Sequence, residues 1–280
     1  MKKLIGILLS ALLLTGCAAT PGAGSSAGET PEAAAGKATG YTLETETVSD
    51  SVQADDGTVL YEYTYDLPRL IYRSDSEGPE EDTAATTTFN AAFDVWREGK
   101  EREETIESAQ LDYDWRQGEG QDWRQYAEAL TYTAYQTDRL ISIVGEYYWD
   151  YGGAHPNVSY QTWNFDLKKG EYIPEDTLGN EAMAQAVTEE LLRQMEEQAK
   201  KIDAPLDALY FSNYQEIAAQ WMSHSVSFDA KGMTVTFSPY ALAPYGAGPQ
   251  NFHIPYGFLE PYLSEYGKEV LPLSQGGNLK

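Results

Sequence analysis

The chain has 280 residues, of which 44 are acidic and 19 are lysine or arginine, giving a formal net charge of −25. This charge argues against nucleic acid and anionic lipid surfaces as partners, and favours either a cationic partner or plain solubility. The single cysteine excludes an intrachain disulfide, so stability has to come from a packed core, to which the 21 tyrosines and 6 tryptophans contribute.

The first 17 residues have the pattern of an export signal. Two lysines precede an apolar run over residues 4–14, which is shorter than the roughly 20 residues that span a bilayer. The run ends in Leu-Thr-Gly-Cys, which resembles the bacterial lipoprotein box and implies cleavage before Cys17 and a lipid on its sulfur. One lipid chain anchors a protein weakly, so we expect a two-chain anchor on the extracytoplasmic face of the cell membrane. The alternatives are an ordinary secretory signal with an incidental cysteine, or an uncleaved anchor.

Residues 18–40 are predicted to be a flexible tether. They consist largely of Ala, Gly, Ser, Thr and Pro and contain almost no aromatic or branched residue. Such a segment cannot bury enough apolar surface to offset the entropy lost on ordering. The remaining chain is long enough for one large domain or two small ones.

The first elements after the tether have the composition of strands. Residues 41–50 and 58–66 are rich in Thr, Val and Tyr and partly alternate, which predicts two strands joined by an Asp-Asp-Gly turn. A further short strand is expected at 69–73, after Pro68, followed by a charged loop over residues 74–82.

Residues 83–110 change to helical spacing, which predicts one helix with Gly99 as a candidate break. Residues 123–151 return to the strand pattern, with a hairpin turn within 135–139.

The second half of the chain mixes both kinds of element. We expect a strand at 158–167, a turn at 168–170, a helix at 178–201 and another helix around 213–222. These are followed by two short strands at 226–228 and 233–237, a strand at 252–256 and a final helix at 257–266. Strands and helices come in clusters and do not alternate strictly, which predicts an α+β fold.

No pattern in the sequence predicts a catalytic or metal site. His155, His224 and His253 lie in separate segments, without a second His or Cys at ligand spacing. A G-x-S-x-G elbow and a Gly-rich phosphate loop are both missing from the sequence. The many carboxylates could supply a glycosidase pair, but nothing singles out two of them. We therefore expect no cofactor, no metal and no enzymatic activity.

Two loops are candidate ligand-binding segments. The first runs from Tyr151 to Asn157 and contains Gly152, Gly153 and His155. Its glycines would let a ligand approach closely, and His155 can donate a hydrogen bond. The alternative is a tight connection between two strands, with His155 buried and bonded to the backbone.

The second candidate loop covers residues 237–248 and follows a predicted strand. It contains two Pro-Tyr pairs and two glycines; the candidate ligand-binding residues are Pro239, Tyr240, Pro244, Tyr245 and Gly248. It could present a rigid aromatic surface to a partner. The alternative is a packed loop whose tyrosines fill a groove.

Together these segments resemble the extracytoplasmic region of RsiV-type anti-sigma factors and the N-terminal, non-catalytic region of PdaC-type peptidoglycan deacetylases (DUF3298 and DUF4163 domains). In that family a Gly-Gly-Ala-His loop precedes an Asn-Phe-Asp strand, and two Pro-Tyr pairs and a glycine precede an aromatic strand. The matching residues are Gly152, Gly153, Ala154, His155, Asn164, Phe165, Asp166, Pro239, Tyr240, Pro244, Tyr245, Gly248, Phe252, Ile254 and Tyr256.

The resemblance implies two small fused modules, with antiparallel sheets and helices packed on one face. A PdaC-like module would cover residues 41–149 and an RsiV-like module residues 150–266, followed by a tail at 267–280. For RsiV-type proteins the family implies lysozyme binding, and a cationic lysozyme suits a strongly acidic binder.

The chain also departs from the family. We expect neither the sigma-binding segment and transmembrane helix of the anti-sigma factors nor the metal-dependent domain of the deacetylases. The leading expectation is a non-enzymatic, lipid-anchored binding module at the cell envelope, with lysozyme or another cationic or cell-wall-related ligand. The alternatives are a cell-wall-active enzyme and an accessory factor of peptidoglycan modification.

Overall fold

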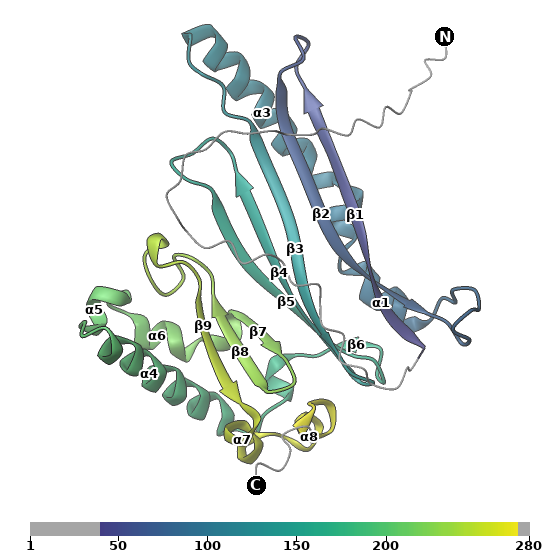
Figure 1. Cartoon of the computed structure of the whole chain (residues 1–280), viewed down its shortest axis with the longest axis vertical. Helices are drawn as coiled ribbons and strands as arrows, with labels where there is room; N and C mark the ends of the chain where they lie inside the picture. The colour runs from purple at the N-terminus through teal and green to yellow at the C-terminus, as the bar shows by residue number, and fades with distance from the viewer. Residues whose placement is uncertain (1–39, 274–280) are drawn as a thin grey trace, which may run out of the picture. The chain divides into compact units, whose positions relative to one another are not determined.

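The computed structural model describes residues 40–273, apart from the side chains of Lys100 and Glu101. The predicted signal peptide with Cys17, the tether up to residue 39 and residues 274–280 of the predicted tail lie outside this range. The predicted α+β class is confirmed: a six-stranded sheet, a three-stranded sheet and several helices make up the described chain (Figure 1). Among residues 40–273, no helix has the length and apolar character needed to cross a bilayer.

The six strands of the first sheet follow one another in chain order. They are β1 (Tyr41–Gln53), β2 (Val59–Tyr72), β3 (Tyr126–Gln136), β4 (Leu140–Asp150), β5 (Asn157–Asp166) and β6 (Glu171–Tyr172). Neighbours are antiparallel except β2 and β3, which run parallel, with Tyr61 opposite Tyr126. A parallel pair requires a long crossover, and the helical segment between β2 and β3 supplies it.

Strand β2 is one continuous strand, so the prediction of a separate strand after Pro68 is wrong. Pro68 lies inside β2, opposite Thr45 of β1. Strand β3 pairs with β2 only from Tyr61 to Tyr65, so one side of β2 has no strand partner at Pro68. A residue without a backbone N–H is tolerated at such a position.

The crossover consists of α1 (Ala84–Ala91), α2 (Asp94–Glu98) and α3 (Lys100–Glu119). Thr83 caps α1 through a capping box with Thr86. The break predicted at Gly99 is confirmed, because Gly99 adopts a left-handed φ of +69°. The single predicted helix over 83–110 is otherwise wrong: the chain also breaks between α1 and α2, and α3 continues to Glu119.

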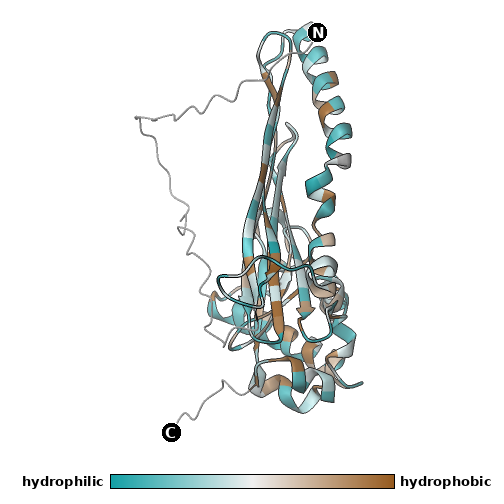
Figure 2. Ribbon diagram, turned by 90° about the vertical axis from the view of Figure 1, so that its right-hand side faces the viewer, coloured by the Kyte–Doolittle hydropathy of each residue, from teal (hydrophilic) through white to brown (hydrophobic). Residues whose placement is uncertain are grey.

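These helices cover one face of the six-stranded sheet, as the view along the sheet shows (Figure 2). Phe89 and Phe93 are fully buried and pack on Ile141, Ile143 and Phe165 of the sheet. Farther along, Ala109 and Tyr113 of α3 pack on the tyrosines of β2. Burial of large aromatic side chains of this kind contributes most of the stabilisation of a core.

The three-stranded sheet is antiparallel and contains β7 (Ser225–Phe228), β8 (Gly232–Phe237) and β9 (Gln250–Pro255). The helices around it are α4 (Met183–Lys201), α5 (Leu206–Leu209), α6 (Tyr214–Ala219), α7 (Tyr256–Leu259) and α8 (Glu265–Val270). Short 3₁₀ turns lie at η1 (Glu175–Thr177), η2 (Trp221–Ser223), η3 (Tyr245–Ala247) and η4 (Glu260–Tyr262).

Helix α4, predicted at 178–201, begins at Met183 and buries one stripe of apolar side chains. Met183, Val187, Leu191 and Met195 are at most 2% exposed, whereas Leu192 is only partly buried. The final helix predicted at 257–266 is broken into α7, η4 and α8, with Pro261 inside the 3₁₀ turn. Within the predicted tail, Val270 and Leu271 are buried against this core.

A buried polar seam joins the two sheets. On the face of β4 and β5 away from α1–α3, Ser142 donates to Asn164 (2.7 Å), and Asn164 donates to the carbonyl of Val226 in β7 (2.8 Å). The N–H of Phe228 donates to Ser142 (2.8 Å), so side chains of one sheet complete the hydrogen bonds of the other.

The module boundary predicted at residues 149/150 stays a prediction; it falls at the end of β4, and β5 and β6 continue the same sheet.

Candidate functional site

The two loops that the sequence singles out meet in the structure. Residues 151–156 connect β4 to β5, and residues 238–249 connect β8 to β9. The His155 ring stacks on the Tyr245 ring, with centroids 3.9 Å apart and planes inclined by 18°. The Tyr240 ring centroid lies 5.9 Å from that of His155 and 5.4 Å from that of Tyr245. We call these three residues the His155–Tyr240–Tyr245 cluster.

Hydrogen bonds orient the rings of this cluster. The carbonyl of Pro156 accepts from the Tyr245 hydroxyl (2.7 Å) and lies 2.8 Å from Nδ1 of His155. A carbonyl only accepts, so Nδ1 carries the proton, and in a neutral ring Nε2 is the acceptor. The Tyr240 hydroxyl lies 3.3 Å from Nε2. His155 is therefore half-buried and bonded to the backbone, while one side of its ring faces the second loop.

Tyr240 combines exposure with an uncommon backbone. It is 54% exposed, and its φ is +67°, in the left-handed region. A non-glycine residue in that region loses roughly 1–2 kcal/mol, so contacts of the adjacent loop residues have to stabilise this backbone conformation. Leu242 and Ala243 are buried, and the Leu242 carbonyl accepts from the N–H of Phe211 (3.0 Å).

The other predicted site residues shape the two loops. Gly152 and Gly248 adopt left-handed φ values of +71° and +69°, which favour glycine. Pro239 and Pro244 each precede one of the two cluster tyrosines. The Gly153 carbonyl accepts a hydrogen bond from the guanidinium of Arg124 (3.1 Å).

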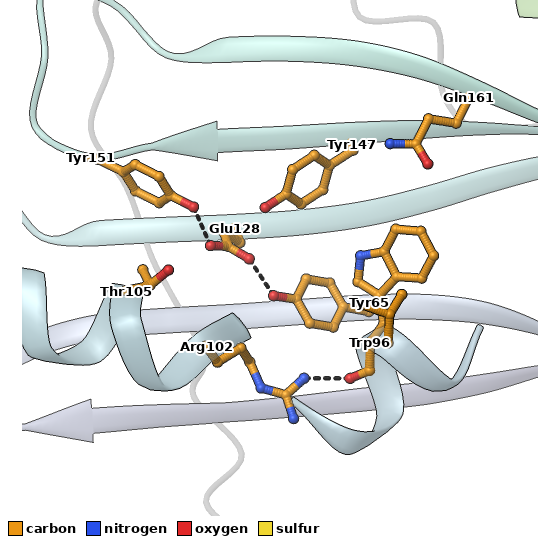
Figure 3. A pocket seen from close by; sticks show the side chains of 9 residues that line it. Tyr65, Trp96, Arg102, Thr105, Glu128, Tyr147, Tyr151 and Gln161 are labelled. Carbon is orange, nitrogen blue, oxygen red and sulfur yellow. Dashed lines mark hydrogen bonds between the residues drawn. The ribbon is translucent and has the colours of Figure 1, made fainter. Parts of the chain in front are cut away.

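A second candidate site lies on the helix-covered face of the six-stranded sheet, and sequence reasoning missed it. A cavity of about 200 Å³ opens between the crossover helices and strands β2 to β5. Glu128 lies at its centre, surrounded by Tyr65, Tyr147 and Tyr151, with Trp96 and Arg102 on the helix side (Figure 3). We call this the Glu128 pocket.

Glu128 is a buried carboxylate with hydroxyl partners. It is 7% exposed; Tyr65 donates to Oε2, and Tyr151 donates to Oε1. The hydroxyl of Tyr61 lies 3.2 Å from that of Tyr65 and extends the network. Among residues 40–273, none of the ion pairs includes Glu128.

The tyrosines of the pocket remain protonated at neutral pH. Burial, together with the hydrogen bond to Glu128, raises the pKa of Tyr151 to about 12. Burial is also the main cause that raises the pKa of Tyr65 and of Tyr147. The hydroxyls of Tyr65 and Tyr151 are thus donors to Glu128.

The only cation that lines the described pocket is directed away from Glu128. The Arg102 guanidinium lies over the Tyr63 ring, 4.3 Å from its centroid, and donates to the carbonyl of Trp96 near the end of α2. Figure 3 shows this group turned toward Trp96 and away from the carboxylate. A cation at the carboxyl end of a helix stabilises it, so Arg102 has a structural role there.

A sequence signal for the pocket exists in hindsight. Tyr126, Glu128 and Leu130 alternate along β3 toward the same face, and Tyr126 and Leu130 are apolar anchors. An acidic residue at the middle position of such a buried face needs partners.

In residues 40–273, no group of three His, Cys, Asp or Glu side chains is arranged to hold a metal ion.

Comparisons with known proteins identify the second part of the chain. Residues 174–257 match the model of a family described as a protein of unknown function, DUF3298. The chain contains a DUF3298 domain. A search of curated proteins finds no match.

Two crystal structures extend the likeness beyond the DUF3298 domain. A DUF3298 family member from Bacteroides fragilis NCTC 9343 has a TM-score of 0.60 at 17% identity, over 80% of this chain and 94% of that one. A DUF3298 family protein from Pseudomonas aeruginosa PAO1 has a TM-score of 0.52 at 16% identity, with the same coverage. At such identities the likeness concerns the fold alone.

The DUF3298 domain contains part of the first candidate site and none of the second. Tyr240 and Tyr245 lie inside it, whereas His155 lies in the loop between β4 and β5, so the cluster forms where the domain meets that loop. Glu128 and the whole pocket lie before residue 174.

Proposed function

We propose that this protein is an exported, lipid-anchored binding protein of the cell envelope, whose acidic domain binds a cationic protein such as lysozyme and performs no catalysis. The observation that carries the proposal is the His155–Tyr240–Tyr245 cluster, in which two loops distant in sequence present one exposed aromatic side chain. Exposed aromatic side chains on an ordered backbone are typical of the hot-spot residues that dominate binding at protein interfaces.

Charge supports a cationic partner. The formal charge of −25 would attract a basic protein over long distances and speed its association. The resemblance to RsiV-type proteins makes a cationic lysozyme the first partner to test. Charge alone attracts any basic protein. The exposed side chain of Tyr240, on its ordered loop, would add a specific contact with the partner.

We expect the purified protein to bind a cationic lysozyme in calorimetric titration, with an affinity that falls as salt is added. Tyr240→Ala should raise the dissociation constant at least about tenfold, the effect of roughly 1.4 kcal/mol. Trp115→Ala on α3 is the matched control, because Trp115 is also 54% exposed. Absence of binding at low salt would remove lysozyme as the partner, and equal affinities of both variants would remove the loops as the contact surface.

The lipid anchor has its own test. Wild-type protein expressed in a bacterium should take up a radiolabelled fatty acid and sediment with membranes, whereas Cys17→Ser should do neither, because the variant lacks the sulfur that forms the thioether. Labelling of Cys17→Ser at the wild-type level would rule out Cys17 as the site of attachment.

A further inference from the structure

The Glu128 pocket combines a buried charge with space for a ligand. Most buried carboxylates are either paired with a cation or neutralised, since desolvating a charge is costly. Glu128 is 7% exposed and receives only tyrosine hydroxyls, on both of its oxygens. Hydroxyl donors stabilise a carboxylate without cancelling its charge, so the pocket retains a negative centre.

The walls around Glu128 add to this negative centre. Tyr65, Tyr147, Tyr151 and Trp96 line the cavity together with Glu128 (Figure 3). The faces of aromatic rings carry partial negative charge and attract cations within about 6 Å. A carboxylate enclosed by several aromatic rings is a combination that suits an organic cation better than a neutral or anionic ligand.

Arg102 lines the pocket but forms no ion pair with Glu128. Its guanidinium lies 4.3 Å from the ring centroid of Tyr63 and 5.7 Å from that of Tyr65, and it donates to the carbonyls of Trp96 and Arg97, the latter at 3.5 Å. The cavity of about 200 Å³ therefore lies beside a carboxylate that no cation among the described side chains pairs with.

We propose that the Glu128 pocket binds an alkylammonium group, with Glu128 as the counter-ion and the surrounding aromatic rings as the cage. A volume of about 200 Å³ admits a small amine or the end of a lysine side chain. The same chemistry thus has two sources: a free organic amine, or a lysine of a protein partner. The inference stands on the pocket alone and does not require lysozyme to be the partner.

The test uses choline and 3,3-dimethyl-1-butanol, which has the same shape but no charge. We expect calorimetric titration of the intact protein to give choline a dissociation constant at least about tenfold lower than that of its neutral isostere. Glu128→Gln keeps the shape of the side chain and removes its charge, and should abolish this difference. Equal affinity of the wild type for both compounds, or no choline binding, would overturn the proposal without any variant having to fold.

Further measurements separate the two sources. Glu146→Gln changes an exposed carboxylate on β4 and serves as a charge-matched control that should leave choline binding unchanged. If Glu128→Gln loses choline but binds lysozyme like wild type, the pocket takes a free amine. If choline competes with lysozyme and Glu128→Gln weakens both, the pocket takes a lysine side chain of the partner. Lysozyme binding to the wild type tests the proposed function separately.

Discussion

Replacing Asp166 by alanine is expected to lower the free energy of unfolding by about 3–5 kcal/mol, because it leaves a largely buried guanidinium without its buried partner. Asp166 has no exposed surface, and its Oδ2 accepts from Arg139 (3.3 Å) and from the hydroxyl of Tyr266 (3.0 Å). Its Oδ1 accepts from the N–H groups of Lys168 (2.9 Å) and Lys169 (3.2 Å), which form the turn before β6.

The measurement is equilibrium urea unfolding of the wild type and of two variants. Glu269→Ala is the matched control, since Glu269 also pairs with Arg139 (3.1 Å) but is 63% exposed. An exposed pair of this kind contributes roughly 0–1 kcal/mol. If Asp166→Ala and Glu269→Ala destabilise the protein equally, Asp166 does not hold β5 and α8 together in the way its contacts indicate.

Gly232→Ala is expected to destabilise the protein by about 2–3 kcal/mol or more, at the upper end of what overpacking costs. Gly232 begins β8, opposite Pro255 of β9. A Cβ at this position would lie 2.2 Å from the carbonyl oxygen of Ile254 and 2.9 Å from its carbonyl carbon. Both atoms belong to the backbone, so the strands themselves would have to separate.

Gly257→Ala provides the control for this change. Gly257 lies in α7, where an added methyl group would have no neighbouring atom within 4 Å, and alanine favours a helix over glycine by roughly 0.8–1.0 kcal/mol. Thermal unfolding should therefore give Gly257→Ala a melting temperature at or above that of the wild type, and Gly232→Ala a lower one. A Gly232→Ala melting temperature equal to that of the wild type would contradict the close approach of β8 and β9.

Periodicity in the sequence predicts most elements of the fold. The alternation in 123–151 predicts the hairpin β3–β4, and the spacing of Met183, Val187 and Leu191 predicts α4. The pattern fails where tertiary contacts decide. The second half of α3 is not predicted, because Leu111 and Trp115 are exposed there. Large apolar residues on the solvent side of a helix break the amphipathic pattern by which a helix is recognised.

The two candidate sites differ in how far sequence reasoning reaches. Unusual composition singles out the loops with His155 and Tyr240, but only the fold brings their rings together. The Glu128 pocket depends on the parallel pairing of Tyr63 with Glu128 across β2 and β3, and on a helix break that positions Arg102. The parallel pair has no local signal in the sequence, whereas the break between α2 and α3 has one in Gly99.

The parallel pair also has a consequence for the order in which the sheet folds. Residues paired between antiparallel neighbours of the sheet are at most 31 positions apart, as Tyr41 and Tyr72 are. Every pair between β2 and β3 is 65 positions apart. The hairpin β1–β2 and the meander β3–β6 can each form from near contacts, and we expect closing the long crossover to be the slow step. Tyr65 belongs to the hairpin and Glu128 to the meander, so we expect the pocket to form only when these two parts have paired.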